Sequence, residues 1–210
     1  MRNSILLLLI VCLFACKKNE FKSFYENGNL KEKYTFSEDE SIRNGIYELY
    51  SEDGKINERA NYNKGTLEGQ RTIFYSNGNP EIIEMYKKDN LDGEYKVFFE
   101  NGQVQITSEY VNGILEGILK KYDEEGNLME EVSFNNNEEN GPFKEYYSNG
   151  KVQWSGNYLN GDNEFGLLEQ FDESGQLLKK MMCDSMGVCQ TIWTPEKGDI
   201  TPAKIKLSKS

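Results

Sequence analysis

Aromatic, apolar and turn-forming residues recur along this chain with a period of about 24 residues. The period is marked by seven turn glycines: Gly28, Gly54, Gly78, Gly102, Gly126, Gly150 and Gly175. The residue four positions before each of them is always aromatic: Phe24, Tyr50, Phe74, Phe98, Tyr122, Tyr146 and Phe171. A fixed period of this length indicates a repeat architecture.

Three further columns keep the same register. Two positions after the glycine stand Leu30, Ile56, Pro80, Val104, Leu128, Val152 and Leu177. Eight positions after it stand Phe36, Tyr62, Tyr86, Tyr110, Phe134, Tyr158 and Cys183. A second glycine lies nine positions before the next turn glycine, at Gly45, Gly69, Gly93, Gly117, Gly141 and Gly166. The short runs between glycines are rich in Tyr, Phe, Ile and Val, which is typical of strands and hairpins. The sequence therefore predicts an all-β fold, an elongated antiparallel meander or stack of about seven β-hairpin repeats.

The turn that ends at each glycine is predicted to be a three-residue loop. A two-residue type I′ loop needs positive φ at both central residues. Asn149 tolerates that, but Glu125 and Ser174 stand at the same position and do not readily adopt it. A three-residue loop needs positive φ only at the glycine, and it sets Tyr146 opposite Val152. We expect this aromatic–apolar pair and the residue eight positions after the glycine to share one face and form an aromatic spine.

The repeat unit resembles a known family. Its pattern is G-x-[YFL]-x-x-[YF]-x-x-[ND]-G-x-[LIV], followed by an aromatic, Asn-Gly, and Leu-Glu-Gly or Leu-Asp-Gly. This resembles the MORN repeat, and more closely the MORN-like variant repeat of bacterial proteins, the YwqK-type antitoxin family. The clearest matches span 69–93, 93–117 and 141–150, and the resemblance covers about 24–183. It implies stacked hairpins that serve mainly as a scaffold.

The N-terminal segment is typical of a secretory signal peptide. The apolar run from Ile5 to Ala15 has eleven residues, too few to span a bilayer core of about 30 Å as a helix. The run ends in Leu-Phe-Ala-Cys at Cys16, which resembles a bacterial lipobox and implies that Cys16 is acylated and anchors the protein to the membrane. An ordinary cleaved signal peptide is the alternative. No aspartate follows Cys16, which resembles the sorting signal for the outer membrane in some Gram-negative bacteria, so a cell-envelope location is expected.

Four segments follow from these features. We expect a lipoprotein signal peptide at 1–15, a polar tether at 16–22, the repeat domain at 23–190 and a C-terminal tail at 191–210. Cys183 and Cys189 lie at the end of the repeats, in an oxidising compartment if the leader is a signal peptide, and a disulfide between them is the favoured interpretation. A free buried pair is the next alternative. A metal site is least favoured, because no histidine or second cysteine pair is available.

Composition restricts the chemistry. The 210 residues carry a formal net charge of −11, and the chain contains no histidine. So acidic a surface repels nucleic acid and anionic lipid headgroups. Without histidine, Ser-His and Cys-His nucleophile pairs are excluded, together with histidine-containing zinc sites. We predict no catalytic residues, no metal and no cofactor.

Some aromatic residues stand outside the repeat columns. These are Tyr25, Tyr75, Phe99, Tyr147 and Trp154, and an exposed row of them would mark an interaction surface. The sequence therefore favours a lipid-anchored, non-enzymatic scaffold that binds an unidentified protein. Two alternatives are an antitoxin or immunity protein that masks a basic toxin, and a carbohydrate-binding module at the cell surface.

Overall fold

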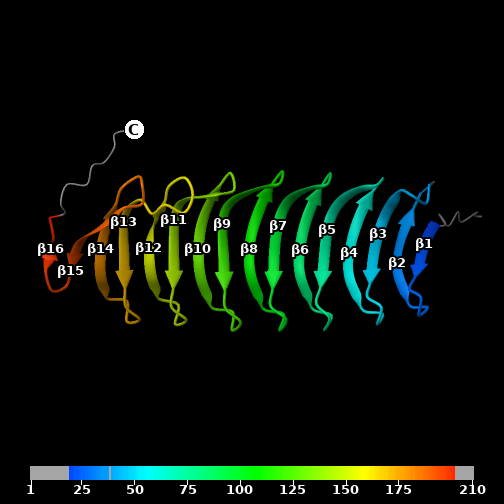
Figure 1. Ribbon diagram of the computed structural model, residues 1–210, viewed down its shortest axis with the longest axis horizontal. Helices are drawn as coiled ribbons and strands as arrows, with labels where there is room; N and C mark the ends of the chain where they lie inside the picture. Colours follow the sequence, from blue (N-terminus) through cyan, green and yellow to red (C-terminus); the bar gives the residue numbers. More distant parts are fainter. Residues whose placement is uncertain (1–18, 38, 202–210) are drawn as a thin grey trace, which may run out of the picture.

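The computed structural model describes residues 19–37 and 39–201, and these residues form one antiparallel β-sheet whose strand order follows the chain. The strands are β1 (Asn19–Phe24), β2 (Leu30–Phe36), β3 (Arg43–Tyr50), β4 (Ile56–Asn63), β5 (Thr66–Phe74), β6 (Pro80–Lys87), β7 (Asn90–Phe98), β8 (Val104–Val111), β9 (Ile114–Tyr122), β10 (Leu128–Asn135), β11 (Glu138–Tyr146), β12 (Val152–Tyr158), β13 (Gly166–Phe171), β14 (Leu177–Cys183), β15 (Cys189–Thr194) and β16 (Gly198–Asp199). Figure 1 shows them side by side, with their turns aligned along two long edges. The predicted all-β meander is confirmed.

Two expected segment boundaries were wrong. The tether was expected to reach residue 22, but β1 begins at Asn19, which pairs with Phe36. The ring of Phe21 stacks on Tyr34, so this segment has a packing partner that its polar composition concealed. The tail was expected from residue 191, but β15 continues to Thr194 and pairs with β16. The expected signal peptide at 1–15, Cys16 and residues 202–210 lie outside the described residues.

The predicted three-residue turn is confirmed. At Gly150, the amide of Tyr147 donates to the carbonyl of Lys151 (2.9 Å) and the amide of Gly150 donates to the carbonyl of Tyr147 (2.8 Å). Gly150 has a φ of 79°, whereas Asn149 keeps a negative φ. Tyr146 pairs with Val152, as expected. The other six aromatic–apolar pairs form in the same way: Phe24–Leu30, Tyr50–Ile56, Phe74–Pro80, Phe98–Val104, Tyr122–Leu128 and Phe171–Leu177.

The prediction of one shared aromatic face was wrong, because a β-bulge follows each of these turns. Tyr146 pairs with Val152, but Glu145 pairs with Trp154, so Gln153 is an extra residue on β12. The extra residue reverses the alternation of side chains along the strand. Tyr146 and Val152 therefore face one side of the sheet, while Tyr158 faces the other.

The side that carries Tyr158 is the core face. There Tyr158 stacks on Phe143, with ring centroids 4.3 Å apart. One buried cluster, near the C-terminal end, consists of Val132, Phe143, Leu168 and Cys183; the other, near the N-terminal end, consists of Tyr34, Tyr47 and Ala60. These residues mostly stand six positions after or seven before a turn glycine and pair across neighbouring strands. No second layer of described residues covers the sheet, so each buried side chain is covered by its neighbouring repeats.

The middle of the core face mixes polar and apolar side chains. The equivalent positions between the two clusters hold Arg71, Glu84, Tyr95, Ser108 and Leu119. The Arg71 guanidinium bridges Glu58 (2.7 Å) and Glu84 (2.8 Å). Ion pairs therefore replace apolar contacts where the array changes from one cluster to the other.

Side chains at the glycine-turn edge link neighbouring repeats. The tyrosines three positions before the glycine donate their hydroxyls to a backbone carbonyl of the next repeat, as Tyr147 does to Phe171 (2.9 Å). The asparagine before the glycine has two contacts. The Asn149 side-chain amide donates to the Glu173 carbonyl (2.9 Å), and its carbonyl oxygen accepts from the Lys151 amide (2.9 Å). Asparagine is thus favoured here for its inter-repeat hydrogen bond rather than for a positive φ.

The opposite edge is linked by two-residue turns. Lys88–Asp89 and Asn136–Asn137 have positive φ at both residues, as type I′ turns require. The amide of Lys88 donates to the carboxylate of Glu68 (3.0 Å). The amide of Asn136 donates to the carboxylate of Glu116 (3.1 Å). The acidic residue of each Leu-Glu-Gly motif therefore binds the backbone of the next turn.

A buried carboxylate lies on the face opposite the core face. Glu48 is 6% exposed and forms ion pairs with Lys33 (2.6 Å) and Arg59 (2.8 Å). The hydroxyl of Tyr50 also donates to it (2.7 Å). Burial by itself would raise the pKa of Glu48, but the hydrogen bonds from Lys33, Tyr50 and Arg59 outweigh this effect and lower it to about 2.

Removing one inter-repeat hydrogen bond should lower stability. We expect Tyr147→Phe to decrease the free energy of unfolding by about 0.5–1.5 kcal/mol, because the Phe171 carbonyl loses its donor. Phe99 occupies the same repeat position without a hydroxyl, so Phe99→Tyr is the matched gain-of-contact variant. Urea unfolding of both measures the effect, and equal stability of Tyr147→Phe and the parent protein would contradict it.

The Glu48 ion pairs should make the free energy of unfolding depend on pH in the acidic range. Because its folded pKa lies below the ordinary value of 4.5, the stabilisation is present above that value and is lost as the pH falls towards 2. Glu48→Gln should therefore be less stable than the parent at pH 7, by about 1–3 kcal/mol, and the difference should narrow at pH 2–3. Urea unfolding at both pH values measures this, with Glu26→Gln, at an exposed turn, as the control. A difference that stays constant with pH would contradict it.

Candidate functional site

The aromatic residues expected to form an exposed row are half-buried instead. The hydroxyls of Tyr25 and Tyr75 donate to the carbonyls of Tyr50 (2.6 Å) and Phe98 (2.7 Å), as Tyr147 does in its repeat. Phe99 occupies the same position. The three tyrosine hydroxyls therefore bind the backbone of the next repeat and link neighbouring repeats.

Trp154 is also half-buried. Its ring packs against the core cluster around Val132 and Phe143, and the Lys179 ammonium lies 5.4 Å from its centroid. The bulge at Gln153 places Trp154 on the core face, which its sequence position did not indicate.

Cys183 and Cys189 are joined by a disulfide, with the sulfurs 1.95 Å apart. They stand opposite each other across an eighth three-residue turn, which ends at Gly187. The disulfide thus takes the place that an aromatic–apolar pair has in the other hairpins. The Glu164 carboxylate lies 3.3 Å from the Cys189 sulfur, but bonded sulfurs offer no thiolate to a metal ion.

Apolar side chains are exposed on the face opposite the core. Ile46, Ile118 and Leu167 all stand eight positions before a turn glycine and are 50%, 54% and 40% exposed. This column was missed by sequence reasoning, because Gln70, Glu94 and Pro142 interrupt it. The available signal was its fixed position directly after the second glycine of each repeat.

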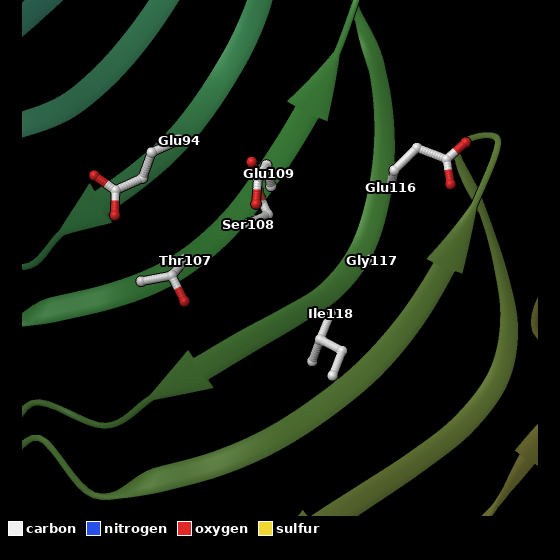
Figure 2. Close-up of a pocket in the computed structure, with 7 residues that line it drawn as sticks. All are labelled: Glu94, Thr107, Ser108, Glu109, Glu116, Gly117 and Ile118. Carbon is white, nitrogen blue, oxygen red and sulfur yellow. The ribbon is translucent and has the colours of Figure 1, made fainter.

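A hollow lies on this face, at the middle of the array. It has a volume of about 600 Å³ and is lined by Glu94, Thr107, Ser108, Glu109, Glu116, Gly117 and Ile118. These residues come from β7, β8 and β9, and Figure 2 shows them spread across the three curved strands. The hollow is open to solvent and has the shape of a shallow groove rather than a closed pocket.

Three carboxylates stand opposite one another in this hollow. Glu94 pairs in register with Glu109, and Glu109 pairs with Glu116. Two of them have partners within the protein. Glu94 forms an ion pair with Lys96 (2.6 Å), and Glu116 accepts a hydrogen bond from the Asn136 amide (3.1 Å). Figure 2 shows Glu116 pointing away from Glu109. Among the described residues no cation pairs with Glu109, so this exposed carboxylate is available to a cationic group.

The hollow offers two kinds of contact. Glu109 beside the exposed Ile118 offers one negative and one apolar contact. A lysine or arginine side chain, with its apolar stem and charged head, matches that pair.

No segment of the described chain forms a helix long and apolar enough to cross a membrane. No curated protein matches the chain. The family model described as MORN repeat variant matches six ranges, at residues 17–38, 43–64, 67–88, 91–112, 115–136 and 139–160. The hairpin β13–β14 lies beyond the last match, yet Phe171 and Leu177 pair as in the other repeats. Since the six matches together cover more than half of the chain, the protein belongs to the MORN repeat variant family.

Proposed function

We propose that this protein is a lipid-anchored protein of the bacterial cell envelope, acting as a non-enzymatic scaffold that binds another protein. The observation that carries the scaffold role is the hollow at Glu109 and Ile118, which pairs an unneutralised carboxylate with an exposed apolar side chain. The lipobox-like leader ending at Cys16 supports the anchor. A family built from structural repeats, generally without catalysis, is consistent with the scaffold role.

The partner surface that fits this hollow is basic with apolar residues beside the charge. Glu94 and Glu109 repel each other across β7 and β8, and a bound cation would relieve that repulsion. The acidic repeats would also speed the approach of a basic partner at low salt.

A basic toxin is one partner of this kind, so an antitoxin role is the second candidate. The same acidic hollow favours it. The half-burial of Tyr25, Tyr75, Phe99, Tyr147 and Trp154 gives no support to a carbohydrate-binding module, because sugar rings stack on exposed aromatic faces.

The anchor is tested by acylation at Cys16. Cells grown with radiolabelled palmitate should label the parent protein and should not label Cys16→Ala, which should leave the membrane fraction. A Cys183→Ala, Cys189→Ala variant controls for loss of a cysteine elsewhere. Equal labelling of Cys16→Ala and the parent protein would refute acylation at this residue.

Glu109→Gln should separate binding from stability. It removes one of two opposed carboxylates, so the free energy of unfolding should stay equal or rise by about 0.2–1 kcal/mol.

A photo-crosslinker at Ile118 should capture a protein in intact cells, and Glu109→Lys should abolish the capture. A crosslinker at the exposed turn residue Glu52 is the matched control. Capture at Glu52 equal to that at Ile118, or capture unaffected by Glu109→Lys, would exclude the hollow as the binding site.

A further inference from the structure

Charge is divided sharply along the mature chain. Residues 17–22 carry three lysines against one glutamate, a net charge of +2. Residues 23–201 carry 17 lysines and arginines against 34 acidic residues, a net charge of −17. Basic residues next to a lipid anchor are attracted to anionic headgroups, whereas acidic surfaces are repelled. The two parts therefore have opposite preferences at a membrane.

The connection between Cys16 and the sheet is very short. Only Lys17 and Lys18 separate Cys16 from β1. Three residue steps reach about 10 Å at most. Asn19 is held in the sheet by its pairing with Phe36, and its side-chain amide donates to the carbonyl of Ser37 (3.0 Å). An acyl chain on Cys16 would thus hold β1 itself at the bilayer surface.

The β1 end also carries an apolar group suited to that surface. Phe24 is 59% exposed, whereas its equivalents in the later repeats are half-buried. Among the described residues, β1 is the edge strand and no strand lies beyond it to cover Phe24. Aromatic side chains are favoured at the level of the lipid headgroups. Lys22 lies on the same strand.

We propose that the array stands on the membrane on its β1 end, with β1 against the headgroups of an anionic phospholipid bilayer and the Cys183–Cys189 hairpin at the far end. This inference rests on the proposed acylation of Cys16. Because the strands follow one another in a single row (Figure 1) and lie about 4.8 Å apart, the last glycine turn lies about 60 Å further from the lipid than the first. The hollow at Glu109 is then held well clear of the bilayer.

One column of the repeat provides labelling positions from which the distance to the bilayer can be measured along the array. Two positions before the turn glycine stand the exposed residues Glu26, Glu52, Glu100, Glu124 and Glu173. With Cys183 and Cys189 bonded and Cys16 acylated, a cysteine placed at one of these positions is the only free thiol of the mature chain. Each single variant would be purified in its lipidated form, labelled with a fluorescent donor and inserted in vesicles of phosphatidylethanolamine and phosphatidylglycerol that contain an acceptor-labelled lipid.

Energy transfer should be strongest from position 26 and fall steadily to position 173. A variant with a ten-residue Gly/Ser insertion between Lys18 and Asn19 should keep its acylation and lose most of this gradient. Equal transfer from all five positions in the acylated protein would overturn the standing orientation and leave the proposed anchor intact. Protein that carries no acyl chain and does not bind the vesicles would overturn the anchor, and the orientation with it.

Discussion

The structure depends on hydrogen bonds between one repeat and the next. A single hairpin of this array buries too little surface to be stable alone, and no second layer of described residues covers the sheet. Stability must therefore come from contacts between neighbours. At one edge Tyr147 and Asn149 donate to carbonyls of the following repeat, and at the other edge Glu116 accepts from the following turn. The hydrogen bonds of these side chains to the next repeat thus set the spacing of the array.

The β-bulge after each glycine turn decides what the two faces contain. Without it, the aromatic–apolar pairs and the aromatic residues further along each strand would share one face. With it, Tyr158 joins Phe143 on the core face, and Tyr146 with Val152 remains on the other. That opposite face also holds Glu48, whose ion pairs lower its pKa to about 2, and the hollow at Glu109. A single extra residue per repeat therefore puts the two buried clusters on one face and the hollow at Glu109 on the other.

The proposed functions of the two ends of the molecule are different. The basic segment at residues 17–22 is suited to contact an anionic membrane, and the acidic repeats are suited to contact a basic protein. Because the repeats form a single row, distance along the chain becomes distance along the array. A binding surface placed at the middle repeats is then presented at a defined distance from an anchor at Cys16.

Sequence alone determined the repeat period, the all-β meander, the three-residue turns and the pairing of Tyr146 with Val152, because these follow from local rules on glycine, asparagine and strand residues. It did not place the start of β1 at Asn19, since the partner of that strand lies seventeen residues away at Phe36. It also misplaced Tyr147 and Trp154 as exposed, because their acceptor and packing partners belong to other strands. The hollow of Glu94, Glu109 and Ile118 arises only when three strands are in register, so the tertiary structure alone decided the candidate site.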